Sequence, residues 1–283
     1  MIDLAELKSN GFLAQKQKGY YIVRFRAIAG NFTTEQLTKA TALADEYGKG
    51  YVHFTTRQGM EIPWIPLENC PAVLQEARQA GLLPGADGAK IRTIVACPGK
   101  EVCRWGIMDS RRLATALDER FFGRVVPKKT KMAVSGCPNS CSKPIENDIG
   151  FMGAAQPGLN QDLCTGCGAC AKLCNAKAIH MVDQRPVINT EKCIQCGKCI
   201  VSCPTKAWEQ ERKGYHILIG GKIGRFPRLG NIVARFVDEE EVEKYTENLL
   251  AIFAELAQPG ERMANVVERL GVEVFKERLE KMI

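Results

Sequence analysis

The sequence predicts an α+β protein built from two layered units and an inserted, cysteine-rich module. Segments typical of strands and helices alternate through residues 19–81 and resume at residue 91. Between them, the stretch LLPGADGAK (82–90) is rich in turn residues and marks a unit boundary. Residues 157–206 break the alternation, because they are polar and rich in Cys, Gly and Lys. At 283 residues, the chain is long enough for two or three domains.

The first unit is predicted to run in the order strand, helix, two strands and helix. Its first segment, GYYIVRFRAIAG, alternates β-branched and aromatic residues as strands do. In the following helix, Thr33 and Gln36 fit a capping box and Gly48 fits a stop. The two strands are expected to turn near Gln58-Gly59, and Gly81 is expected to end the last helix. These elements are expected over residues 19–30, 31–50, 51–65 and 69–81.

The second unit is predicted to alternate short strands and helices around the inserted module. Two short strands run into loops that contain cysteine, and after the module the βα pattern resumes and ends in two helices. The acids from Asp238 to Glu241 are interpreted as a first helical turn, which the helix dipole favours, rather than as a metal site. These elements are expected over residues 91–99, 101–123, 129–141, 214–230, 238–257 and 271–283.

The composition is that of an ordinary globular protein. Hydrophobic residues make up 45% and charged residues 25% of the chain, and no segment approaches the roughly eighteen apolar residues of a membrane span. The start, MIDLAELKSNGF, lacks the basic-then-apolar run of a signal peptide, so a cytoplasmic protein without membrane attachment is expected. The net charge of +7 is scattered, which favours an anionic substrate or cofactor over nucleic acid.

The thirteen cysteines are the strongest signal in the chain. All except Cys70 lie between residues 97 and 203, and the odd, clustered count argues against a disulfide framework. Metal ligation is therefore predicted for the clustered cysteines, and Cys70 is expected to be a small buried residue. The histidines His53, His180 and His216 are interpreted as structural residues rather than ligands.

The inserted module contains the bacterial ferredoxin run C-x2-C-x2-C-x3-C twice. In such pairs of runs the fourth cysteine of each ligates the other cluster. This predicts two [4Fe–4S] clusters, with zinc as the alternative that two complete runs disfavour. Asn175 stands where the first run usually has proline, which affects the turn rather than the ligation. The predicted ligand sets are Cys164, Cys167, Cys170 and Cys203 for one cluster, and Cys193, Cys196, Cys199 and Cys174 for the other.

Four cysteines remain, in the segments CPGKEVC and CPNSC. They are Cys97, Cys103, Cys137 and Cys141. Both segments follow predicted strands, so both are expected in loops at one end of a sheet, where ligand sites collect. Four thiolates there predict a third [4Fe–4S] site or a zinc site.

These two segments resemble the sirohaem-dependent sulfite and nitrite reductases. C-x5-C is followed by C-x3-C, with proline after the first cysteine of each pair, and the likeness extends over nearly the whole chain. The ferredoxin-type insert narrows the resemblance to the C-type subunits of anaerobic sulfite reductases and to dissimilatory-type subunits. The segments that match in family order are TTRQG (55–59), IRTIVAC (91–97), PKKTK (127–131) and GGKIG (220–224).

The resemblance implies cofactors and site residues. The four remaining cysteines would hold a [4Fe–4S] cluster, and Cys141 would also bridge to the iron of sirohaem. Four cations would surround the substrate, namely Arg57, Arg92, Lys129 and Lys131. Further sirohaem contacts would come from Asn139 and from Gly220, Gly221, Lys222 and Gly224. The implied domains are a ferredoxin-like half-domain (1–85), a sirohaem and [4Fe–4S] domain (86–156 with 207–283), and an inserted 2[4Fe–4S] ferredoxin domain (157–206).

Elementary electrostatics agrees with a cluster of cations at such a site. Two like charges about 4 Å apart repel by about 4 kcal/mol at an effective dielectric of about 20, so an anion needs cations to approach an anionic macrocycle. Arginine suits bidentate contacts to oxyanions, and lysine can also deliver protons. In a strand, Lys129 and Lys131 would face the same side. The alternative interpretation is that all four cations are solvated surface charges.

The resemblance implies a catalytic subunit that reduces sulfite to sulfide with six electrons relayed through its clusters. No flavin or nicotinamide motif is apparent, so an electron-donor protein is expected as partner. Larger members of the family carry two copies of the repeat, so this single-copy chain is expected to form a homodimer or a multiple of it. The alternatives are a sirohaem nitrite reductase and a non-catalytic iron–sulfur electron carrier.

Overall fold

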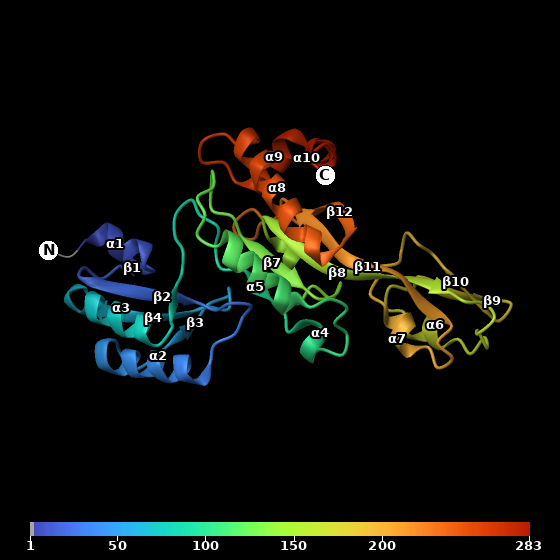
Figure 1. Ribbon diagram of the computed structural model, residues 1–283, viewed down its shortest axis with the longest axis horizontal. Helices are drawn as coiled ribbons and strands as arrows, with labels where there is room; N and C mark the ends of the chain where they lie inside the picture. Colours follow the sequence, from blue (N-terminus) through green and yellow to red (C-terminus); the bar gives the residue numbers. More distant parts are fainter. Residues whose placement is uncertain (1–2) are drawn as a thin grey trace.

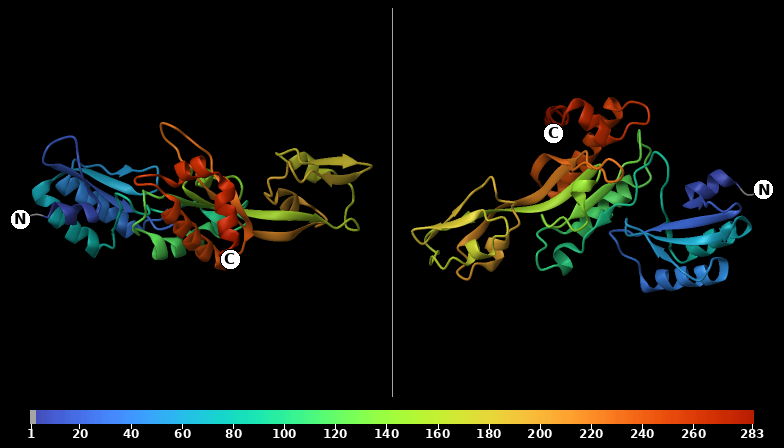
Figure 2. Two further views of the ribbon diagram at one scale, coloured as in Figure 1. Left: turned by 90° about the horizontal axis from the view of Figure 1, so that it is seen from above. Right: turned by 180° about the vertical axis from the view of Figure 1, so that it is seen from behind.

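A computed structural model describes residues 3–283 and shows three units arranged along one direction (Figure 1). An N-terminal sheet lies at one end, a larger sheet with the C-terminal helices lies in the middle, and a small unit lies at the far end (Figures 1 and 2). Within these residues, no helix is both long and apolar enough to cross a membrane.

The N-terminal unit is an antiparallel sheet covered by helices. Its strand order is β1-β2-β4-β3, with β5 paired to β2, and its core contains Phe12, Phe25 and Ile62. The predicted capping box of Thr33 and Gln36 is confirmed, and Gly48 is the C-cap of that helix. The elements are α1 (Leu4–Ser9), β1 (Phe12–Ala14), β2 (Tyr20–Arg26), α2 (Thr34–Tyr47), β3 (His53–Phe54), β4 (Met60–Pro66), α3 (Cys70–Gln79) and β5 (Leu83–Pro84).

The central unit is a mixed sheet with the order β12-β11-β8-β7-β6. The three strands β6, β7 and β8 are parallel, whereas β11 pairs antiparallel with both β8 and β12. Its core, which includes Phe151, Tyr215 and Phe253, lies between this sheet and the helices. The elements are β6 (Val95–Ala96), α4 (Gly99–Val102), α5 (Ser110–Phe121), β7 (Met132–Ser135), β8 (Ile149–Leu159), β11 (Trp208–Ile219), β12 (Asn231–Val237), α8 (Val242–Leu256), α9 (Met263–Leu270) and α10 (Val272–Glu280).

The predictions for the central unit were wrong in two places. The helix expected over 101–123 is two helices, α4 and α5, because the chain folds back between them. At Gly106 an added Cβ would lie 2.5 Å from the backbone nitrogen of Lys100, and Asp109 then caps α5. The βα pattern expected after the module is instead the antiparallel pair β11–β12, and helix α9 was not foreseen.

The small unit is carried on the extended ends of β8 and β11. These strands pair from Ile149 opposite Ile219 to Leu159 opposite Trp208, so they form a continuous ribbon out of the central sheet (Figures 1 and 2). Residues 160–207 fold at its tip around a small core that includes Cys170 and Trp208. Its elements are α6 (Ala169–Leu173), β9 (Ile179–Val182), β10 (Arg185–Ile188) and α7 (Lys198–Ser202).

Candidate active site and metal centres

The segments CPGKEVC and CPNSC lie together at the carboxyl ends of β6 and β7. These strands are parallel neighbours, as the sequence predicted, so the loops after them leave the same edge of the sheet. The backbone N–H of Cys97 donates to Val134 O (3.2 Å), and the N–H of Gly136 donates to Cys97 Sγ (3.2 Å). Burial raises the pKa of Cys137, and the thiols of Cys97, Cys141 and Cys103 add to that effect. All four cysteines are therefore neighbours.

The four thiols differ in their exposure to solvent. Cys137 is buried and Cys141 is exposed, with Ser140 between them in the left-handed region (φ 57°). The Ser142 hydroxyl donates to Val134 O (2.6 Å), which returns the chain to β7 directly after Cys141. Asn139 is also exposed in this loop. The geometry leaves one face of the thiol group open at Cys141.

The four predicted cations converge on one open pocket of about 420 Å³. Arg57 comes from the turn between β3 and β4, Arg92 from the segment before β6, and Lys129 and Lys131 from the segment before β7. Thr130, between the two lysines, is buried, which agrees with the predicted alternation. With Arg24 included, five cations and the two carboxylates of Glu61 and Asp87 line the pocket, so its lining favours an anion.

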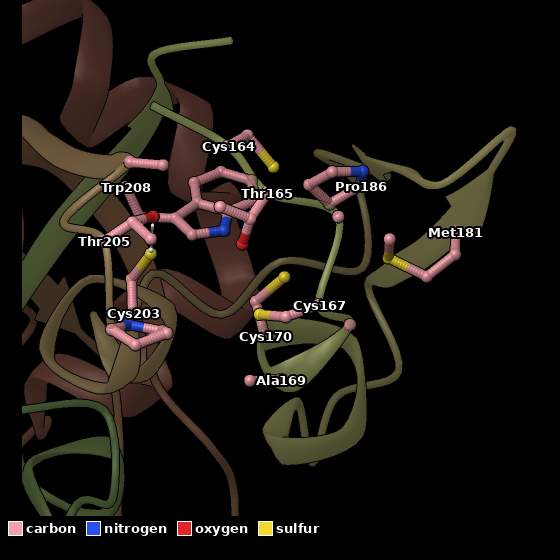
Figure 3. Close-up of a pocket in the computed structure, with 14 residues that line it drawn as sticks. Cys164, Thr165, Cys167, Ala169, Cys170, Met181, Pro186, Cys203, Thr205 and Trp208 are labelled. Atoms are coloured by element: carbon pink, nitrogen blue, oxygen red, sulfur yellow. Dashed lines mark hydrogen bonds between the residues drawn. The ribbon is translucent and has the colours of Figure 1, made fainter. Parts of the chain in front are cut away.

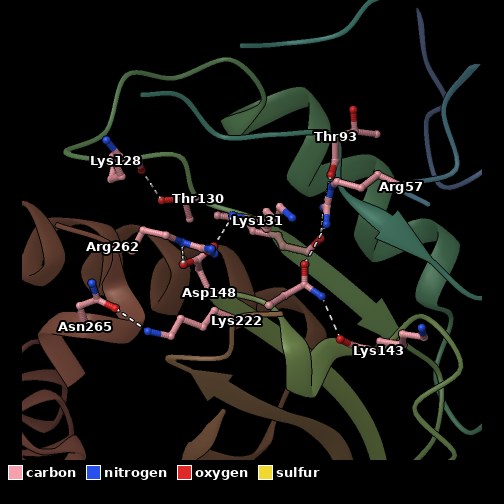
Figure 4. Close-up of polar contacts among 12 residues, drawn as sticks. Arg57, Thr93, Lys128, Thr130, Lys131, Lys143, Asp148, Lys222, Arg262 and Asn265 are labelled. Atoms are coloured by element: carbon pink, nitrogen blue, oxygen red, sulfur yellow. Dashed lines mark hydrogen bonds and ion pairs between the residues drawn. The ribbon is translucent and has the colours of Figure 1, made fainter. Parts of the chain in front are cut away.

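Arg57 is held across the boundary between the N-terminal and central units (Figure 4). Its Nη1 donates to Asn147 Oδ1 (2.9 Å), and its Nη2 donates to the backbone oxygens of Thr93 and Met132 (2.9 Å to Met132). Burial lowers the pKa of Arg57 to about 10, so the guanidinium stays protonated at neutral pH. Its Nε is buried and has no partner, which leaves one donor unused.

Arg92 is held by the turn-rich segment that joins the first two units. Its Nη1 donates to Ala86 O and to Asp87 Oδ1 (3.1 Å), and its Nη2 donates to Gly88 O (3.0 Å). The terminal nitrogens are therefore already paired, and only the buried Nε lacks a partner. Of the four cations, Arg92 is the one most strongly neutralised by its surroundings.

Lys131 has the most perturbed amine in the pocket. Burial, together with the nearby charges of Arg57, Arg262 and Lys129, lowers its pKa to about 8. Its backbone N–H donates to Asp148 Oδ2 (2.9 Å). An amine poised near neutral pH can hold a proton and also release it.

The sequence analysis missed a buried ion pair beside Lys131. Arg262 binds the fully buried Asp148 through both nitrogens, Nη2 to Oδ2 (2.6 Å) and Nε to Oδ1 (3.2 Å) (Figure 4). The only signal in the sequence is the polar trio Glu146-Asn147-Asp148 directly before an apolar strand. This carboxylate braces the start of β8, next to the asparagine that binds Arg57.

Gln58 was also missed as a site residue. It adopts a left-handed backbone (φ 60°), and its side chain pairs twice with the backbone of Ala96: Nε2 to Ala96 O (2.6 Å) and Ala96 N to Oε1 (2.9 Å). Ala96 precedes Cys97 directly. The segment TTRQG therefore also docks the N-terminal unit on the edge of the cysteine site.

The GGKIG turn lies beside the Asn147–Asp148 segment. The N–H of Gly220 donates to Asp148 O (2.9 Å), and an added Cβ at Gly221 would collide with the backbone oxygen of Ile145, so this contact requires glycine. Lys222 instead turns to Asn265, with Nζ 2.7 Å from Oδ1 (Figure 4). At Gly224 an added Cβ would meet open space. The four predicted sirohaem contacts of this turn thus lie near Asp148, although Lys222 points to another helix.

The eight cysteines of the small unit gather in the two predicted sets. One cavity is lined by Cys164, Cys167, Cys170 and Cys203 (Figure 3). The other is lined by Cys174, Cys193, Cys196 and Cys199. Backbone N–H groups donate to sulfur in the second set, from Ala178 to Cys174 (3.3 Å) and from Gln195 to Cys193 (3.4 Å). Each cavity has the thiol donors that a [4Fe–4S] cluster takes.

The thiol groups are not arranged around a single ion. Within residues 3–283, no three His, Cys, Asp or Glu side chains converge closely enough to hold one metal ion. A four-iron cluster lies between four thiolates that stand farther apart than the ligands of one zinc, whose bonds to sulfur are about 2.3 Å.

Two curated relatives resemble the chain over almost all of its length. It is 33% identical to the coenzyme F420-dependent sulfite reductase of Methanocaldococcus jannaschii over 96% of this chain, which spans only 44% of that protein. It is 30% identical to the C-type subunit of the anaerobic sulfite reductase of Salmonella typhimurium, over 98% of this chain and 89% of that relative.

Two solved structures share the fold. Dissimilatory sulfite reductase I aligns with a TM-score of 0.76 at 19% identity, over 92% of this chain and 69% of that chain. The NirA protein of Mycobacterium tuberculosis aligns with a TM-score of 0.70 at 17% identity, over 99% of this chain and 47% of that chain.

Two family models cover both larger units. The ferredoxin-like half domain of nitrite and sulfite reductases matches residues 13–80, and the nitrite and sulphite reductase 4Fe-4S domain matches residues 87–283. The second match includes both cysteine loops, three of the four pocket cations and the ribbon with its small unit. With the resemblance extending over almost the whole chain, this protein belongs to the nitrite and sulphite reductase family.

Proposed function

We propose that the chain is the catalytic subunit of a sirohaem-dependent sulfite reductase. The reaction would be HSO3⁻ + 6e⁻ + 6H⁺ → HS⁻ + 3H2O. The observation that carries the proposal is the convergence of Arg57, Arg92, Lys129 and Lys131 on one pocket. Lone surface cations would not gather from three separate segments into a cavity, and the surplus of positive charge suits a small oxyanion.

The cysteine loops would hold the cofactors of the active site. Cys97, Cys103, Cys137 and Cys141 would bind a [4Fe–4S] cluster, and the exposed Cys141 would also face the sirohaem. When bound, the sirohaem would supply the iron at which sulfite is reduced, and the clusters would supply single electrons. The N–H of Gly136 on Cys97 Sγ fits a thiolate ligand, because such bonds stabilise negative charge on sulfur.

The pocket cations would bind the anion and manage protons. Arg57, fixed by Asn147 and two backbone oxygens, would orient an oxyanion through a donor that the protein leaves unused. Lys131, with a pKa of about 8, would hold a proton close to the substrate oxygens and release it as water leaves. Lys129 would add positive charge at the mouth.

The small unit would act as an electron entry module. Its two sets of four cysteines would bind one [4Fe–4S] cluster each, so it would be an inserted ferredoxin domain carried on the β8–β11 ribbon. An electron-donor protein or subunit would reduce it. The second candidate function is nitrite reduction, which the same cationic pocket would also serve. A simple electron carrier would have no use for such a pocket.

The test is anaerobic purification followed by spectroscopy and assay. Fully loaded protein should contain about thirteen irons per chain with little zinc, and should show sirohaem absorption. With chemically reduced viologen as donor, sulfide release from sulfite should exceed ammonia release from nitrite. Active protein with only eight irons and no porphyrin band would contradict the sirohaem assignment, and faster nitrite turnover would favour the second candidate.

A further inference from the structure

Gln195 stands in a backbone conformation that its counterpart in the first cysteine run satisfies with glycine. In Cys193-Ile194-Gln195-Cys196, Gln195 has φ 56°, and in Cys164-Thr165-Gly166-Cys167 the matching Gly166 has φ 73°. Left-handed backbone costs a non-glycine residue about 1 kcal/mol or more. A side chain that is kept at such a position is expected to make a contact that glycine could not make.

That contact is with His216, a buried residue of β11 on the ribbon. The N–H of Phe236 lies 3.2 Å from His216 Nδ1, and His216 Nε2 lies 2.6 Å from Gln195 Oε1. Because Nδ1 must accept from the backbone N–H, the proton of the neutral ring is on Nε2, which donates to Gln195. Burial lowers the pKa of His216 to about 4, so the ring is neutral over the physiological range.

The backbone of Gln195 faces the ribbon on one side and the thiolate on the other. Its carbonyl accepts from the N–H of Ala155 in β8 (2.9 Å), and its own N–H donates to Cys193 Sγ (3.4 Å). Nearby, an added Cβ at Gly197 would be in contact with Ala155 and with Ile107, which belongs to the loop after Cys103. The cysteine set of Gln195 is therefore the one that faces the central unit.

We propose that His216 and Gln195 form a latch that fixes the N–H of Gln195 on Cys193 Sγ and so raises the reduction potential of the inner cluster. His216 is a positioning residue, because it acts on the thiolate only through Gln195. The proposal rests on the proposed function in assigning a [4Fe–4S] cluster to Cys174, Cys193, Cys196 and Cys199. It predicts a difference between the two clusters, because Gly166 offers no side chain for such a latch.

The direction follows from the charge on the cluster. Reduction by one electron makes the thiolates more negative, so an N–H aimed at sulfur stabilises the reduced form more than the oxidised form. Freeing Gln195 from His216 lets this N–H move away from sulfur, which favours the oxidised form. The expected change is roughly tenfold in the ratio of reduced to oxidised inner cluster at a fixed potential, or about 59 mV for one electron.

Two variants test the latch in the full, cofactor-loaded chain. His216→Phe removes the donor to Gln195, and Gln195→Gly removes its acceptor while adopting the backbone that Gly166 already shows. His180→Gln, at an exposed histidine of the same small unit, is the matched control. Each protein is titrated with dithionite and redox mediators while the clusters are followed by electron paramagnetic resonance, and iron content is measured on the same samples.

The expected result is a lower potential for one cluster in both latch variants, with full iron content and with the other clusters unchanged. His180→Gln should match the parent protein. Unchanged potentials in fully loaded variants would overturn the latch alone. Parent protein that lacks the two clusters of the small unit would overturn the cluster assignment. If His216→Phe does not fold, Gln195→Gly still decides the matter, because its backbone is compatible with the fold.

Discussion

Arg57 and Asn147 join the N-terminal unit to the central unit at the wall of the cationic pocket, with Arg57 Nη1 2.9 Å from Asn147 Oδ1. The same asparagine donates through Nδ2 to the backbone oxygen of Lys143 (2.8 Å), two residues after Cys141. A single amide thus ties the orientation of the guanidinium to the loop that carries the exposed thiol.

Replacing this amide should impair substrate binding without unfolding the protein. In Asn147→Leu, Arg57 keeps its two backbone acceptors but loses one bond to a charged donor, worth about 1.5–3 kcal/mol. We expect kcat/KM for sulfite to fall roughly tenfold or more. Asn265→Leu, which removes the partner of Lys222 outside the pocket, is the control. Equal kinetics in the two variants would show that Asn147 does not position Arg57.

Asp87 should weaken substrate binding, because its carboxylate neutralises Arg92. The pair is separated by 3.1 Å, and Asp87 also lines the pocket. In Asp87→Asn the pocket loses one negative charge, so the KM for sulfite should fall by roughly two- to fivefold, as partly exposed pairs contribute about 0.2–1 kcal/mol. Steady-state kinetics at low and high salt would check this. A higher KM would mean that Asp87 is needed to hold Arg92 in place.

Lys131 should give the reaction a pH dependence. Its pKa is lowered from 10.5 to about 8, so it is charged below that pH and neutral above it. Affinity for sulfite should therefore be present at pH 7 and decline as the pH rises through about 8. Lys131→Arg keeps the charge at all these pH values and should remove this decline. Because the ionisation of sulfite itself is common to both proteins, a profile that is identical in the two would contradict the role of Lys131.

Pocket cations and cysteine ligands should separate by cofactor loading. Arg92→Ala should lower turnover by roughly ten- to a hundredfold while sirohaem absorption survives. Cys141→Ser should instead reduce sirohaem loading. Lys128→Ala, at an exposed lysine outside the pocket lining, is the matched control for charge loss. Wild-type sulfite kinetics in Arg92→Ala, with sirohaem in place, would assign these charges to the solvated surface.

The assembly should be a two-fold homodimer or a multiple of it, with pocket and thiol loop contributed by different copies. Larger members of the family divide the site between two repeats in this way. Mixing a Lys131→Ala protomer with a Cys141→Ser protomer should then restore part of the activity, measured after the protomers have exchanged. No recovery, with mixed dimers present by mass, would place each site within one chain.

Local chemistry explains which parts of the site could be predicted from the sequence. The cysteine runs have fixed spacing because four thiolates must surround one cluster, and the period of a strand aligned Lys129 with Lys131. Gln58 could not be predicted, because its acceptor and donor on Ala96 become neighbours only when two units dock. Arg262 likewise follows Asp148 by more than a hundred residues, and nothing local marks the pair.

The same reasoning explains the errors in the fold. The helix expected over 101–123 has good helix-forming residues, yet the backbone around Gly106 packs too closely on Lys100 for it to continue. Strand β12 was hidden because its pairing with β11 contains register shifts, so its side chains do not alternate cleanly between buried and exposed. Tertiary packing decided both cases.

The β8–β11 ribbon makes the small unit separable from the rest of the molecule. The chain leaves the ribbon at Leu159 and returns at Trp208, its direct partner across the strands. A tight hairpin turn would span the same gap, so a gene could gain or lose this segment without altering the register of the parent sheet. Such an exchange would change the source of reducing power while the catalytic pocket stayed as it was. The ribbon thus provides a socket at which lineages can match one reductase to different metabolisms.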